Sequence, residues 1–194
     1  MKNGHGIWKH GSLLIIGAGC IMFSACNLNA KQATLAEKGQ AVAVIVLPDE
    51  PIPSEQTAAA ELSAYLHKVT GAEFKIVKER AAGAAPAKSR IFIGPSKAAT
   101  RVLGNKQVEA LGPEDFIVRA AGGDLLLVGG RPRGSLYAVY SFLEKEVGCR
   151  WFNWYGDEFV PRLETLEIAD LDRREGNVHN AKDWRTVLEP VVVM

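Results

Sequence analysis

The chain has 194 residues, of which 47% are hydrophobic, and a formal net charge of +1. That size and apolar content suit one folded domain with a real core, and they exclude a chain that is disordered throughout. The near-zero charge, with no basic block along the sequence, argues against nucleic acid as a partner.

The first 26 residues have the layout of an export signal. After a weakly basic start, the apolar run Leu13–Phe23 spans about eleven residues, which is too short to cross a bilayer comfortably. Small residues before Cys26 indicate a bacterial lipoprotein, in which Cys26 would be lipidated and become the N-terminus. The alternatives are an ordinary secretory signal cut near Ala25 or Ala30, or a retained anchor. We therefore expect an exported protein, lipid-anchored at the cell envelope (outer membrane or periplasm) or otherwise secreted.

A polar linker, a buried strand and a long helix are expected next. Residues 27–40 are small and polar, which predicts a flexible tether. Residues 41–47 form an apolar, β-branched run that is typical of a buried strand. Ser54 is the expected N-cap of a helix that ends at Gly71. The expected buried stripe of this helix consists of Ala58, Ala59, Leu62, Tyr65, Leu66 and Val69.

The middle of the chain predicts short elements between glycine-rich turns. The predicted strands are 74–77, 90–94, 115–120 and 125–128. Residues 81–87 form a flexible loop, and a short helix should end near Gly104. The last two strands flank Gly122 and Gly123, which favours an antiparallel hairpin.

A second long helix is predicted from residue 134 to its end at Gly148. Its apolar side consists of Leu136, Val139, Tyr140, Leu143 and Val147. Residues 149–152 are extended, residues 165–168 indicate a final edge strand, and no element is recognisable from Arg173 on. This order predicts an α+β or α/β fold, a mixed β-sheet packed with two long helices and one short helix.

Three segments of the chain together carry a family resemblance: residues 55–77, 91–96 and 126–152. The third contains Gly-Gly-Arg-Pro-Arg-Gly-Ser-Leu-Tyr-Ala-Val-Tyr and ends in Val-Gly-Cys-Arg-Trp-Phe. Over residues 41–170 the chain resembles the N-terminal domain of family 67 α-glucuronidases and related bacterial glycosidase-like proteins. It is also similar to domain 2 of family 20 hexosaminidases, the non-catalytic α/β domain that precedes the barrel.

The resemblance implies an accessory domain in front of a catalytic (β/α)₈ barrel, which carries the acid and base carboxylates. No catalytic residue can be assigned to this chain, and residues 171–194 form a tail that could be the truncated start of a barrel. We therefore expect a non-catalytic module that is inactive alone. The alternatives are a free-standing cell-surface module that binds carbohydrate or another partner, and a scaffold without a glycan role.

The aromatic segment after the second helix is the best candidate for sugar binding. Aromatic faces stack on pyranose rings, and Trp151, Trp154 and Tyr155 lie close to Arg150 in the sequence. The alternative is that these rings pack in the core or against the barrel. Asp157 and Glu158 follow in the same loop, but adjacent carboxylates rarely face each other across a substrate, so a solvated turn is expected.

Arg131 and Arg133 precede the second long helix and could hold a carboxylate such as a uronic acid. The alternative is two surface arginines in a turn. No cofactor or metal is expected, because the four histidines lack metal-ligand spacing and residues 129–135 lack the ending of a phosphate-binding loop. Cys149 has no catalytic partner in the sequence and should pack inside.

Overall fold

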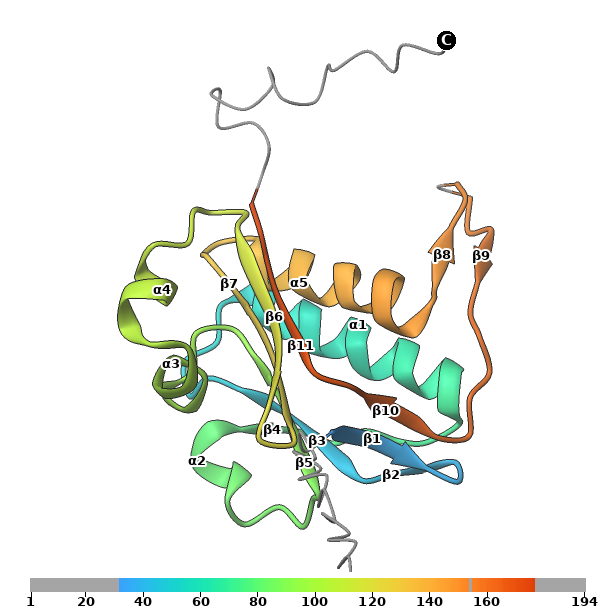
Figure 1. Ribbon diagram of the computed structural model, residues 1–194. Coiled ribbons are helices and arrows are strands. Elements are labelled where there is room, and N and C mark those ends of the chain that lie inside the picture. Colours follow the sequence, from blue (N-terminus) through green and yellow to red (C-terminus); the bar gives the residue numbers. More distant parts are fainter. Residues whose placement is uncertain (1–31, 154, 177–194) are drawn as a thin grey trace, which may run out of the picture.

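A six-stranded mixed sheet forms the centre of the molecule in the computed structural model, which describes residues 32–153 and 155–176 (Figure 1). Its strands are β3 (Ala43–Leu47), β4 (Ile76–Lys78), β5 (Ser89–Ile93), β6 (Phe116–Ala121), β7 (Asp124–Gly129) and β11 (Leu171–Glu175). The order across the sheet is β11-β6-β7-β5-β3-β4. Strands β7, β5, β3 and β4 are parallel, whereas β6 is antiparallel to both of its neighbours.

Helices cover both faces of this sheet. The long helix α1 (Pro53–Thr70) and α5 (Gly134–Phe142), which continues as a π-helical turn η1 (Leu143–Val147), pack on one face. The short helices are α2 (Glu79–Ala82), α3 (Lys97–Leu103) and α4 (Asn105–Glu109). Alternate side chains of β3 enter the two cores: Ile45 packs with the α1 and α5 residues, and Val46 packs with the α2 and α3 residues. The predicted fold class is confirmed, although α2 and α4 were not predicted.

Helix α1 packs its apolar stripe into the main core. All six apolar residues of its predicted stripe are buried, and burying Leu62 or Leu66 contributes about 1.5–3 kcal/mol each. Gly71 ends the helix in the left-handed conformation, as predicted. The predicted N-cap was wrong: Ile52 occupies that position, because Pro53 fits the first helical turn. The Ser54 hydroxyl donates instead to the Pro132 carbonyl.

A three-stranded antiparallel sheet flanks the main one, with β1 (Ala33–Glu37) between β2 (Gln40–Ala41) and β10 (Leu166–Ile168). The tether predicted over residues 27–40 is therefore wrong for its described part. The reason is that Leu35 is completely buried and Ala33 pairs with Ile168, far along the chain.

The C-terminal part also differs from the prediction. Residues 165–168 do form an edge strand, but β11 follows and pairs along its whole length with β6, so Arg173 lies in regular structure. Its residues alternate between half-buried and exposed positions, and most of them are charged. The strand therefore lacks the apolar run from which the other strands were predicted. The predicted signal 1–26 with Cys26, the predicted Trp154 contact and residues 177–194 of the tail lie outside the described residues.

A narrow two-stranded arm projects from the end of η1 (Figure 1). It consists of β8 (Arg150–Trp151) and β9 (Glu158–Phe159), which pair antiparallel. Within the part of the chain that the structure describes, no helix has both the length and the apolar character needed to cross a membrane.

Candidate functional site

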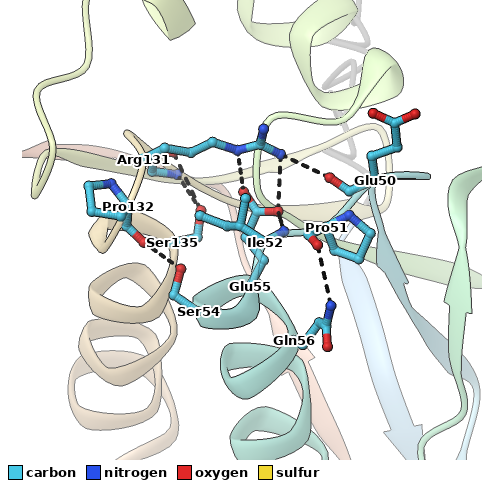
Figure 2. Close-up of polar contacts among 10 residues, drawn as sticks. Glu50, Pro51, Ile52, Ser54, Glu55, Gln56, Arg131, Pro132 and Ser135 are labelled. Carbon is cyan, nitrogen blue, oxygen red and sulfur yellow. Dashed lines mark hydrogen bonds and ion pairs between the residues drawn. The ribbon is translucent and has the colours of Figure 1, made fainter.

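An internal ion pair occupies the carboxyl ends of the parallel strands (Figure 2). Glu55 lies in the first turn of α1 with 1% of its side chain exposed, and Arg131 follows β7. Arg131 Nε donates to Glu55 Oε1 over 2.9 Å, and its Nη2 donates to Oε2 over 3.2 Å. The backbone N–H of Ile52 donates to the same Oε2 over 3.0 Å. The guanidinium fork predicted to hold an external carboxylate thus already holds one from within the chain.

The surrounding loops are built around this pair. A Cβ added at Gly94, whose φ is +78°, would lie 3.0 Å from the Glu55 carboxyl carbon. A hollow of about 420 Å³ opens beside it, at an edge of the sheet where α/β proteins commonly bind ligands. Its acidic side chains serve the fold, however: Glu79 accepts from the N–H groups of Lys97 and Ala98 at the start of α3. The hollow therefore carries no ligand assignment.

Arg133 has a different partner from Arg131. It is 60% exposed and lies 3.2 Å from Glu114. The uronate site at the two arginines stays a prediction, and the geometry gives each guanidinium an internal carboxylate.

A chain of hydrogen bonds fixes the arm to α1. The Trp151 indole N–H donates to the Tyr65 hydroxyl over 2.7 Å, and that hydroxyl donates to Glu158 Oε2 over 2.7 Å. The Lys68 ammonium completes the chain at 2.6 Å from Glu158 Oε1. Trp151 also meets Tyr65 and Tyr140 edge to face, with ring centroids 5.3 and 5.5 Å apart. The indole is therefore held in one orientation.

The electrostatics of the arm do not favour Glu158 as a general acid. Hydrogen bonds from Lys68, and then from Tyr65, hold the pKa of the Glu158 carboxyl below its usual range. The same bond to Glu158 raises the pKa of Lys68, and burial raises the pKa of Tyr65. A glycosidase acid needs the opposite shift, a raised carboxyl pKa. Asp157 is exposed and accepts a hydrogen bond from the Asn153 side chain, as expected of a solvated turn, but that expectation is wrong for Glu158, which lies in β9 and pairs with Lys68.

An aromatic groove of about 630 Å³ runs beside the base of the arm. It is lined by Tyr65, Tyr137, Tyr140, Ser141, Glu144, Lys145, Trp151 and Glu175. The structure thus brings Trp151 together with tyrosines from α1 and α5. Tyr65 and Tyr140 had been predicted only as members of apolar stripes, and Tyr137 had not been predicted at all. Two tyrosines three residues apart on one helix, Tyr137 and Tyr140, are the signal that could have found it.

Tyr155 and Arg150, two other predicted sugar contacts, are not part of the groove lining. Tyr155 is 77% exposed in the loop of the arm. The Arg150 guanidinium donates to the backbone carbonyls of Cys149, over 2.8 Å, and of Glu144. Cys149 is buried, as predicted, and burial raises the pKa of its thiol.

Comparisons with known proteins agree with the resemblance that the three segments carry. The family model described as "Glycosyl hydrolase family 67 N-terminus" matches residues 27–142. The fold is similar to part of a solved family GH115 4-O-methyl-alpha-glucuronidase with specificity for decorated arabinogalactans, with a TM-score of 0.53 and 17% identity. The match covers 74% of this chain but 18% of that enzyme. No curated protein matches the sequence.

Proposed function

Since this chain belongs to the family of glycosyl hydrolase family 67 N-terminal domains, we propose that it is a non-catalytic accessory domain of a carbohydrate-active, glucuronidase-like protein. Catalysis would take place on a barrel domain that this domain supports. The low pKa of Glu158, bound by a lysine, is consistent with that division of labour.

The observation that carries this proposal is the exposed aromatic surface of the arm. Phe152, Tyr155 and Phe159 are 70%, 77% and 54% exposed, and Trp151 is 36% exposed. Large apolar side chains gathered on one projecting hairpin mark a surface that another body covers. The matched part is less than a fifth of the similar glucuronidase, since the match covers 18% of it. A catalytic domain of such an enzyme is therefore the occupant that we assign to the arm.

The test uses a family 67 catalytic barrel expressed without its own N-terminal domain. We expect the barrel to co-elute with this chain in size-exclusion chromatography, and the double variant Phe152→Ser/Phe159→Ser to lose the complex. Val102→Ser is the matched control, because Val102 is 50% exposed but lies on α3, away from the arm. Equal loss in the control, or turnover of an α-glucuronide by this chain alone, would contradict the proposal.

A second candidate function is a free-standing, cell-surface module that binds glycans. The aromatic groove beside Trp151 favours it, because an oriented indole and two neighbouring tyrosines form a pocket that needs no further domain. Titration with oligosaccharides separates this function from the first.

We also propose that the protein is exported and anchored through a lipid on Cys26. The support is the apolar run and the small residues that precede this cysteine in the sequence. Labelling with an alkyne fatty acid should tag the wild-type protein in a bacterial host and leave Cys26→Ser unlabelled and in the soluble fraction. Labelling that persists in Cys26→Ser would refute the assignment. In that case, loss of the label in Cys20→Ser would show that Cys20 carries the lipid.

A further inference from the structure

The aromatic groove is preorganised for a flat, hydroxyl-rich ligand. Trp151 is fixed before any ligand arrives, by its hydrogen bond to Tyr65 and by its edge-to-face contacts with Tyr65 and Tyr140. Little side-chain entropy is therefore lost when a ring packs against it. Tyr137 lies half-buried on α5 and supplies a further aromatic wall.

Polar groups line the groove beside these rings. Ser141 and the carboxylates of Glu144 and Glu175 can accept hydrogen bonds from ligand hydroxyls. Lys145 can donate, although its ammonium lies 2.7 Å from Glu175. Apolar walls with a few hydrogen-bonding groups suit a sugar ring, which presents C–H groups on its faces and hydroxyls around its edge.

The charges in the groove select against acidic sugars. Lys145 and Arg173 both pair with Glu175, at 2.7 and 2.5 Å, and Arg173 also pairs with Glu146 at 2.7 Å, so two carboxylates balance these two cations. Glu144 is exposed and has no ion-pair partner among the described residues. A uronate carboxylate in the groove would meet this negative charge while the nearby cations are already engaged, which disfavours its binding.

We infer that the aromatic groove binds an uncharged sugar ring and discriminates against uronic acids. The inference rests on the second proposed function, glycan binding, and it specifies both the site and the class of sugar. It also separates this site from the arginines first considered for uronate, Arg131 and Arg133, each of which pairs with a carboxylate of the chain.

The experiment is isothermal titration of the chain with neutral xylohexaose, neutral galactohexaose and acidic trigalacturonic acid, with Trp fluorescence followed in parallel. At least one neutral hexaose should bind with a Kd on the order of 1 mM or tighter. The acidic sugar should bind about tenfold more weakly or not at all. Tyr137→Ala should weaken neutral binding about tenfold, whereas Tyr155→Ala, in the arm loop, should leave it unchanged.

Three further outcomes show which part of the inference fails. Glu144→Lys replaces an exposed carboxylate of the groove lining by a cation and should admit the acidic sugar; an unchanged preference would overturn the charge argument. Neutral binding that is insensitive to Tyr137→Ala but lost in Tyr155→Ala would keep glycan binding as a function and refute the groove. No binding of either neutral hexaose would refute the inference, while the co-elution test with the barrel would still decide the accessory role.

Discussion

At the residue scale, the buried carboxylate of Glu55 lies so close to Gly94 that a side chain at position 94 would press on it. The carboxylate of Glu55 is buried and uses both oxygens, so it needs a neighbour that leaves it room. Gly94 supplies that room and also takes a backbone conformation, φ +78°, that side chains with a Cβ avoid. Two separate physical requirements therefore fall on one glycine.

Alanine substitutions can separate those requirements. Gly71 has nearly the same φ, +74°, but an added Cβ there would meet nothing within 4 Å. Gly71→Ala should cost about 1–2 kcal/mol of unfolding free energy, from the left-handed conformation alone. Gly94→Ala should cost more, because its Cβ also presses on the Glu55 carboxylate. Urea denaturation measures both, and equal losses would show that the contact does not matter.

Glu158 gives the fold a dependence on acid. Its folded-state pKa is depressed, chiefly by the hydrogen bond from Lys68, so its contribution to stability is complete above the unfolded pKa of about 4.3. As pH falls through that value and then through the lower folded pKa, the unfolded chain takes up the proton first and the contribution is lost. We expect Glu158→Gln to remove part of the acid-induced loss of stability.

The matched control for that prediction is Glu167→Gln, an exposed glutamate on β10. The difference between the denaturation midpoints at pH 7 and at about pH 3.5 should be smaller for Glu158→Gln than for the wild-type protein. They should keep their wild-type separation in the control. If the pH dependence of stability is the same in Glu158→Gln as in the wild-type protein, the bond to Lys68 makes no pH-dependent contribution to stability.

At the scale of elements, β1 holds the small sheet to the main core. The Leu35 side chain of β1 is completely buried in the main core cluster. Leu35→Ala should therefore cost about 2–5 kcal/mol. Thr34→Ala, the neighbouring half-exposed position that pairs with Glu167, should cost far less. Thermal unfolding of both variants checks this, and similar melting temperatures would mean that residues 33–37 add nothing to stability.

The elements that sequence reasoning recovered are those with a strong local pattern. The α1 stripe from Ala58 to Val69, the β6–β7 hairpin and the glycine ends at Gly71 and Gly148 all follow from residues close together in the chain. Strand β1 escaped because Ala-Thr-Leu-Ala-Glu is short and weakly apolar. Its burial depends on β10, which lies more than a hundred residues later.

The candidate site was harder to predict for the same reason. Nothing local in the sequence pairs Glu55 with Arg131, 76 residues away, so their ion pair was not predicted. Tyr65 and Tyr140 were both assigned to apolar stripes. Tyr65 is buried as expected, whereas Tyr140 is only half-buried, and both rings meet Trp151. Long-range pairings of polar atoms leave no periodic trace in one sequence.

At the scale of the whole molecule, two faces serve different purposes. The carboxyl ends of the parallel strands are closed by the Glu55–Arg131 pair and by capping carboxylates, so charged groups there stabilise the fold. The arm and the groove carry the exposed aromatic side chains. We therefore propose that recognition takes place on the side away from the position where α/β folds commonly hold their ligands.

The pairing of β1 with β10, and of β6 with β11, has a consequence for biosynthesis. A nascent chain emerges from its N-terminus, so β1 and β6 exist long before the strands that complete them. Until residue 168 has been synthesised β1 presents an open edge to other polypeptides, and β6 does so until residue 175. A chaperone that shields those edges during translation would thus protect this domain while they are still unpaired.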